Sequence, residues 1–218
     1  MAPINPVLQL CGKGMQAEAE GRAADAEELF RQAWKVATDD YDACVAAHYV
    51  ARHQKTPDDT LRWNQECLDR ADRVGDDRVR GFYPSLHVNL GRAHQELGHR
   101  ENALDHYRRG RDCIKDVPPG PYADGLRFAI AVGLRATGES MPDSRDDLAE
   151  LIALLCARAN LPALGILIPA YLGDLGTADD HAKLLTAMHM VHGGRSLGDD
   201  ELALLRRAIA ARSRPATA

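Results

Sequence analysis

Nine histidines are the side chains that could most readily hold a metal ion or transfer a proton. Their densest group is "HAKLLTAMHMVHGG", which contains His181, His189 and His192. Offsets of eight and eleven residues place the three imidazoles near one face of a helix. His181 and His189 would nevertheless stand about 12 Å apart along the helix axis, which is too far for one ion. We therefore expect a partly exposed helix face here and no metal site.

Two further patterns could carry chemistry. Cys67 would be a nucleophile only if a base reached it from elsewhere in the fold, because no Ser/His/Asp or Cys/His spacing is recognisable. The segment "HGGRS" at 192–196 could cradle a phosphate, but no Walker lysine follows it and no strand pattern precedes it. We interpret this segment as a helix stop, and we expect no catalytic residue and no cofactor.

The remaining histidines of interest fall in segments with helical periodicity. His48, His53, His87 and His94 alternate with charged and aromatic residues, which favours the polar wall of a groove. An all-α enzyme that uses His48, His53 and His94 on this polar face is the alternative hypothesis.

Composition limits the elements that could position these side chains. The chain has 218 residues, of which 45% are hydrophobic, enough for a sizeable core. Aromatic residues make up only 5%, and the abundant Ala, Leu, Arg and Glu predict an all-α fold. The net charge of -5 argues against nucleic acid or an anionic membrane as a partner, because both would require a basic face.

Cysteine usage and hydropathy predict the cell compartment. The five cysteines are odd in number and never form a C-x-x-C pair, which is typical of reduced, packed thiols in a cytosolic protein. The first residues, "MAPINPVLQLCGKGMQ", lack the pattern of a signal peptide. The most apolar window, 161–173, is too short to cross a bilayer. We expect a cytoplasmic location without membrane contact, and the Arg-, Ala- and Asp-rich usage suggests a bacterial gene.

A helix, a turn and a second helix are predicted in "NLGRAHQELGHRENALDHYRRG", residues 89–110. Small and apolar residues recur at helical spacing on both sides of Gly98, which ends the first helix. Small residues at Gly91, Ala103 and Gly110 would let the two helices approach closely, with Tyr107 between them. Such a pair cannot bury both of its apolar faces alone, so further copies are expected.

One copy lies upstream, in "GMQAEAEGRAADAEELFRQAW" at 14–34. Five positions match at a constant separation of 77 residues: Gly14, Gly21, Ala26, Phe30 and Ala33 correspond to Gly91, Gly98, Ala103, Tyr107 and Gly110. Between the two copies, "HYVARHQKTPDDTLRWNQECLDRA" at 48–71 repeats the pattern more weakly. It carries Thr60, Asn64 and Cys67 in place of the alanine, the aromatic and the small residue. Thr56 and Pro57 predict where its second helix begins.

These positions resemble the tetratricopeptide repeat (TPR) family, in bacterial form with long-helix or degenerate repeats. Ala26, Thr60 and Ala103 are spaced by 34 and then 43 residues, so longer helices are expected in the second interval. The resemblance implies a right-handed α-α superhelix of TPR-like hairpins with a C-terminal helical cap. We expect the repeats to occupy 6–138, the capping bundle 143–212 and a flexible tail 213–218.

The C-terminal part lacks the repeat signature and is more apolar. Helices are expected near 145–159, 161–174, 178–192 and 198–212, and Ser144 with Asp147 could form a capping box. Two interpretations of the apolar segment 150–173 remain open. It could seal the open end of the repeats, or it could form a homo-oligomer interface.

The resemblance also implies a concave groove lined by the first helix of each hairpin. Its register places there Leu8, Cys11, Met15 and Glu18, then Val45, Tyr49, Arg52 and His53, then Ser85, Val88, Asn89, Arg92, Gln95 and Glu96. The residues expected to contact a ligand are Met15, Val45, Tyr49, Arg52, His53, Asn89, Arg92 and Glu96.

The function that this groove implies is that of a non-enzymatic scaffold or adaptor for a protein or peptide ligand. Only Asn89 and Arg92 match the carboxylate clamp of some family members, so binding of chaperone tails is disfavoured. A ligand-responsive regulatory sensor is the second hypothesis. The groove could also be a solvated face, or be filled by another subunit or by the C-terminal helices.

Overall fold

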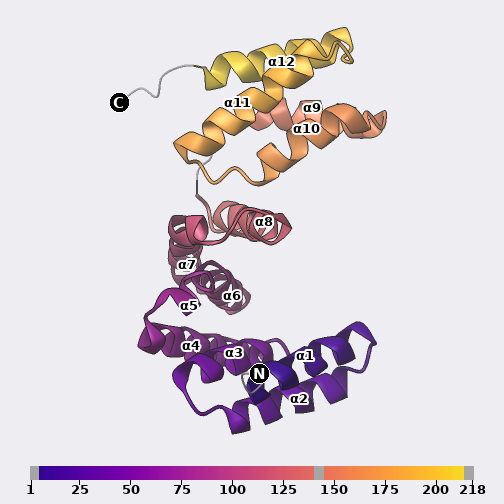
Figure 1. The fold of residues 1–218 in the computed structure, drawn as a ribbon. Helices are drawn as coiled ribbons and strands as arrows, with labels where there is room; N and C mark the ends of the chain where they lie inside the picture. Colours follow the sequence, from indigo (N-terminus) through magenta and orange to yellow (C-terminus); the bar gives the residue numbers. More distant parts are fainter. Residues whose placement is uncertain (1–4, 140–144, 214–218) are drawn as a thin grey trace. The chain divides into compact units, whose positions relative to one another are not determined.

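The computed structural model describes residues 5–139 and 145–213, and all regular structure in these ranges is helical (Figure 1). It contains twelve α-helices and one 3-10 turn, which confirms the expected all-α fold. The chain divides into two compact units, Met1–Pro119 and Gly120–Ala218, called here the N-terminal and C-terminal units. No helix in the described ranges is long and apolar enough to cross a membrane.

The N-terminal unit consists of three helix hairpins. The first pairs α1 with α2, the second α3 with α4, and the third α6 with α7. The helices are α1 (Pro6–Ala19), α2 (Ala23–Val36), α3 (Asp40–Ala51), α4 (Pro57–Val74), α5 (Asp77–Arg80), α6 (Tyr83–Glu96) and α7 (Arg100–Cys113), followed by the 3-10 turn Ile114–Asp116. The hairpins therefore lie where the repeat pattern predicted them.

The first and third hairpins share one packing contact, an aromatic ring of the second helix against a glycine of the first. An added Cβ at Gly14 would lie 2.3 Å from the Phe30 ring, and one at Gly91 would lie 2.8 Å from the Tyr107 ring. Each aromatic ring therefore rests directly on the backbone of the preceding helix, which only glycine permits. The turns match as well, with left-handed φ values of 76° at Gly21 and 75° at Gly98.

The second hairpin lacks this contact between a ring and a glycine. Asn64 occupies the position of the aromatic ring and is buried. Its second helix begins as predicted, because the Thr56 hydroxyl accepts from the Asp59 backbone N–H at 3.1 Å and Pro57 follows the cap. Two features account for the 43-residue interval between Thr60 and Ala103. The first, a longer helix, was expected. Helix α4 has 18 residues against 14 in α7, and the short helix α5, which the periodicity did not predict, lies after it.

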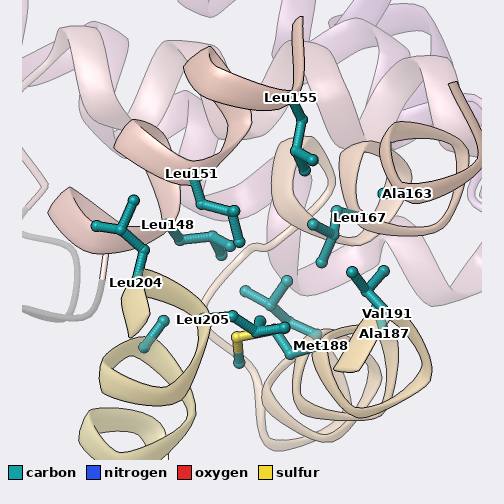
Figure 2. Packing of buried hydrophobic residues seen from close by; sticks show 12 residues of the cluster. Leu148, Leu151, Leu155, Ala163, Leu167, Ala187, Met188, Val191, Leu204 and Leu205 are labelled. Atoms are coloured by element: carbon teal, nitrogen blue, oxygen red, sulfur yellow. The ribbon is translucent and has the colours of Figure 1, made fainter. Parts of the chain in front are cut away.

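The C-terminal unit contains α8 (Pro121–Ala136), α9 (Arg145–Ala157), α10 (Leu161–Leu172), α11 (Ala178–Gly193) and α12 (Asp199–Arg212). The last four helices lie within two residues of the predicted ranges, and "HGGRS" does end a helix. Each packs on two others around one core that includes Leu151, Leu167, Met188 and Leu205 (Figure 2). Every helix thus buries an apolar stripe against its neighbours.

The division into units differs in position from the expected domain boundaries. Helix α8 falls in the C-terminal unit and packs on α10, although its sequence was grouped with the repeats. The boundaries 6–138 and 143–212 and the capping role of the bundle stay predictions. Ser144 and most of the tail 213–218 lie outside the described residues.

The bundle core uses most of the apolar segment 150–173. Leu151, Leu155 and Leu167 are buried in it, while Leu161 is 71% exposed. Self-association through this segment stays a prediction. Cys11, Cys44 and Cys67 are buried free thiols as expected, but Cys156 is exposed on this segment, because its position on α9 faces away from the core, so the expectation of packed thiols was wrong for Cys156.

A buried ion pair ties the end of α12 to the loop that precedes α11. Arg212 donates to an Asp174 carboxylate oxygen at 2.7 Å, and the two side chains are 3% and 0% exposed. Asp174 also accepts from the Gly176 backbone N–H at 2.9 Å. The carboxylate therefore holds a turn and a helix end together while it neutralises the guanidinium.

Gly91→Ala tests the packing contact of the first and third hairpins. We expect it to lower the free energy of unfolding by about 1–3 kcal/mol, because the new methyl group would displace the Tyr107 ring. The measurement is urea unfolding followed by circular dichroism. Gly12→Ala is the control, because a Cβ there meets nothing within 4 Å; it should be neutral or raise stability by up to about 1 kcal/mol. Equal effects of the two changes would contradict the packing argument.

Asp174→Ala tests the buried ion pair. We expect a loss of about 3–5 kcal/mol in thermal or denaturant unfolding, because Arg212 would be left buried without its counter-ion. Asp147→Ala removes one member of the Arg207–Asp147 pair, whose atoms lie 2.9 Å apart and which is more exposed than the Arg212–Asp174 pair; it should cost about 1 kcal/mol or less. A loss at Asp174 no larger than that at Asp147 would refute a stabilising role for the pair.

Candidate functional site

A pocket of about 480 Å³ lies between the second hairpin and α6. Four of the residues expected to bind a ligand line it together. Its lining is Ala51 at the end of α3, Arg52 and Gln54 just after it, Thr60 and Asn64 on α4, and Asn89, Arg92, Ala93 and Glu96 on α6. Arg52, Asn89, Arg92 and Glu96 thus meet although they come from two hairpins; their role in binding stays a prediction.

Helix α6 forms one wall because of its spacing. Asn89, Arg92, Ala93 and Glu96 follow the i, i+3, i+4, i+7 pattern, so they share one face. Ala93 is buried at the base of that face, and its small side chain leaves room for the pocket. The flanking polar side chains are half-buried or exposed, so they can reach a ligand.

Asn64 is a pocket residue whose polar side chain is buried. Its side chain is only 3% exposed, and its Oδ1 atom is buried without a hydrogen-bond partner among the residues that the structure describes. An unsatisfied buried carbonyl costs about 1–3 kcal/mol, so such a group calls for an explanation. A ligand N–H or O–H would supply the missing bond once the Asn64 amide turns towards the pocket, because the Oδ1 atom itself is closed to solvent. The sequence signal for this residue was the break in the repeat pattern at 64, which did not point to binding.

The charges of the pocket differ in how far they are already neutralised. Arg52 is bonded to Glu18 at 3.0 Å and lies over the Tyr49 ring, 5.8 Å from its centroid. Arg92 and Glu96 form no hydrogen bond or ion pair with any residue in the described part of the chain. The uncompensated cation of the pocket is therefore Arg92, and Glu96 lies one helical turn away as an acceptor.

The other expected ligand residues lie in a separate cluster between α1 and α3. The Tyr49 hydroxyl donates to the Met15 sulfur at 3.1 Å, and the His53 Nε2 atom lies 2.8 Å from Glu18. Tyr49 also stacks on Phe30 with ring centroids 4.9 Å apart. Val45 is half-buried against the same core. These side chains already hold one another, so the pocket and not this cluster offers unused bonding capacity.

Several groove positions were assigned wrongly. Cys11 and Val88 are buried in the packing between helices, because they fall on the inward side of α1 and α6. His87 and His94 are buried as well and contact residues of α7 or its cap, so they do not form the groove wall. The enzyme hypothesis required His94 on the groove face with His48 and His53. Because His94 is buried, the three histidines do not share that face, and the enzyme hypothesis loses the arrangement on which it depended.

Two other cavities each contain an arginine that is already paired. A cavity of about 570 Å³ near Trp34 includes Arg70, which is bonded to Asp40 at 2.9 Å and Glu66 at 2.7 Å. In the C-terminal unit a cavity of about 690 Å³ includes Arg127, which pairs with Asp180 and with the Gly173 carbonyl. Within residues 5–139 and 145–213, no group of three or more His, Cys, Asp or Glu side chains could hold a metal ion.

Asn64→Leu tests whether the amide is kept for binding. We expect the unliganded protein to become more stable by about 1 kcal/mol in denaturant unfolding, because the isosteric apolar side chain needs no partner. Gln65→Leu on the exposed side of α4 is the matched control and should change stability by less than about 0.5 kcal/mol. Destabilisation by Asn64→Leu would indicate that the amide serves the fold.

Comparison with known proteins identifies the fold. No family model matches the sequence, and no curated protein matches it. Two crystal structures of nearly identical TPR-like repeats, from a Podosopora anserina protein described as a kinesin light chain, are similar. One has a TM-score of 0.53 at 13% identity and covers 97% of this chain and 100% of its own. The other, a point variant of the same repeats, has a TM-score of 0.52 at 12% identity, covering 95% and 94%. The chain therefore has the all-α, helical-repeat fold of TPR-like proteins.

Proposed function

We propose that this protein is a non-enzymatic scaffold that binds a segment of another protein in the pocket between α3, α4 and α6. TPR-like folds generally mediate contacts between proteins, which supports the class of function. The observation that carries the choice of pocket is Asn64, a buried amide whose oxygen lacks a partner at the pocket wall.

The pocket's side chains favour a polypeptide that bears a carboxylate. Amide groups such as Asn64 and Asn89 can both donate and accept, which matches the alternating N–H and C=O groups of a main chain. Arg92 can form charge-assisted bonds with an acidic side chain or a chain end. Ligands of this kind would supply both the donor that Asn64 lacks and the anion that Arg92 lacks.

The scaffold favours binding because its walls are built before the ligand arrives. Ala51 and Ala93 are buried in helix packing, and the pocket residues are carried by three packed helices. A preformed surface of this kind pays little ordering entropy on association. A cytoplasmic, bacterial setting is part of the proposal and rests on composition.

Arg92→Ala tests the proposal. Peptides are first selected from a random-peptide display library on the purified wild-type protein, and their affinities are measured by fluorescence anisotropy. We expect Arg92→Ala to weaken binding by about tenfold or more, because a charge-assisted hydrogen bond is lost.

Arg62→Ala is the control for this experiment. Arg62 is likewise an exposed arginine, on α4 of the second hairpin, but it pairs with Asp59 at 3.0 Å and does not line the pocket. Its removal should leave the affinity unchanged. If both variants bind as wild type does, or if selection yields no peptide that depends on Arg92, the proposed site is wrong.

A further inference from the structure

Four histidines form a continuous row in the third hairpin. His87 and His94 lie on α6, His106 lies on α7, and His99 caps the start of α7. The Nδ1 atoms of His87 and His106 are 3.1 Å apart, and those of His94 and His99 are 3.3 Å apart. The rings of His94 and His106 stack with centroids 5.4 Å apart and planes at 14°. The row therefore runs His87, His106, His94, His99.

This row lies on the opposite side of α6 from the pocket. His87 and His94 are seven residues apart and share a face, and each is two residues from a pocket residue, Asn89 or Arg92. Two residues correspond to about 200° of rotation on a helix. His87 and His94 are 8% and 9% exposed. Helix α6 thus presents one face to the ligand pocket and the other to the histidine row.

The contacts in the row depend on neutral imidazoles. A hydrogen bond between two Nδ1 atoms requires a proton on one and a lone pair on the other. When both imidazoles of a pair are protonated, both Nδ1 atoms are donors, and two N–H groups with like charge face each other. The pairs His87–His106 and His94–His99 therefore cannot persist once both members carry a charge.

Charged groups on the surrounding elements do not compensate for this. Asp72 on α4 and Asp105 on α7 favour the protonated form of His87, while Arg109 on α7 opposes it. The Asp72 carboxylate is also bonded to the Tyr83 hydroxyl at 2.8 Å, and the Tyr83 ring lies 6.3 Å from His87. Around His94 the neighbouring titratable groups are His99 and His106, neither of which is acidic.

The direction of the pH effect follows from burial. Burial lowers the pKa of His87 and His94, and burial together with the neighbouring histidines lowers the pKa of His106 to about 4. A pKa below the ordinary value of 6.5 means that the opened hairpin binds protons more readily than the closed one. The packed arrangement is therefore fully stable above pH 6.5 and loses stability as the pH falls from 6.5 towards about 4.

We propose that mild acidification releases α6 from α7 at the histidine row and so disassembles the pocket on the other face of α6. The protein would bind its ligand more weakly in acid than at neutral pH. The release of α6 rests on the contacts and the burial of the four histidines, and it does not depend on the proposed function. Its consequence for a ligand rests on the proposed function, because the pocket residues Asn89, Arg92 and Glu96 move with α6.

Hydrogen exchange of the full chain, read by mass spectrometry, tests the release of α6. Exchange of the peptides that cover α6 is compared at about pH 7.5 and about pH 5, after correction for the pH dependence of intrinsic exchange. His106 alone is expected to make the open form about 30-fold more populated at the lower pH. Exchange of α1 and α2 is the internal reference, and the same protection of α6 at both pH values would overturn the proposal.

His106→Gln removes the central titratable group and should reduce the acid-induced exchange of α6 by about tenfold or more. His189→Gln, an exposed histidine of the C-terminal unit, is the matched control and should retain the full response. If His106→Gln does not fold, His87→Gln is used, since it removes the partner of His106 in the row, and burial also lowers the pKa of His87. A response of undiminished size in the variant would also overturn the proposal.

Affinity at the two pH values separates the two proposals. The peptides selected by display are titrated against wild type and His106→Gln, and we expect affinity to fall further in acid for wild type than for His106→Gln. If α6 opens in acid but no peptide binding depends on Arg92, the proposed function fails and the opening of α6 stands. If binding depends on Arg92 and α6 stays protected in acid, the binding function stands and the acid response is refuted.

Discussion

The close approach of an aromatic ring to a glycine backbone sets the geometry of the N-terminal unit. Phe30 over Gly14 and Tyr107 over Gly91 fix how near the two helices of a hairpin can lie. The second hairpin lacks this contact, because Asn64 stands where a ring would be. A ring can satisfy its position by apolar packing alone, whereas an amide also requires hydrogen bonds. The polar pocket is therefore linked to the place where the repeat loses its aromatic residue.

Helix α6 is the element through which binding and protonation can influence each other. Its pocket face carries polar groups that lack internal partners, and its opposite face carries two buried histidines. A rigid helix that loses its packing on one face cannot keep its side chains in register on the other. Coupling between the faces therefore requires no long pathway, because a single packed element contributes to both.

The sequence predicted those parts of the fold that depend on local periodicity. The helices of the C-terminal unit, the Gly98 turn and the Gly91–Tyr107 packing follow from spacing and from glycine's conformational freedom. The direction in which an individual side chain points was less predictable than the position of its helix. The repeat register placed Cys11 and Val88 in the groove, but both lie in the interior. The rotation of a helix about its own axis is set by the helices that pack against it.

The exposed and half-buried polar residues of the candidate site were predicted from the sequence, and its buried polar residues were not. Arg52, Asn89, Arg92 and Glu96 were found because first-helix positions recur with the repeat. Asn64 and the histidine row were not, since an unpartnered atom or a 3.1 Å contact between two rings exists only after α4, α6 and α7 have packed. Both features keep polar groups in the interior at a cost to stability. A fold selected for stability alone would replace them with apolar side chains, so their presence favours a role in binding and in its control.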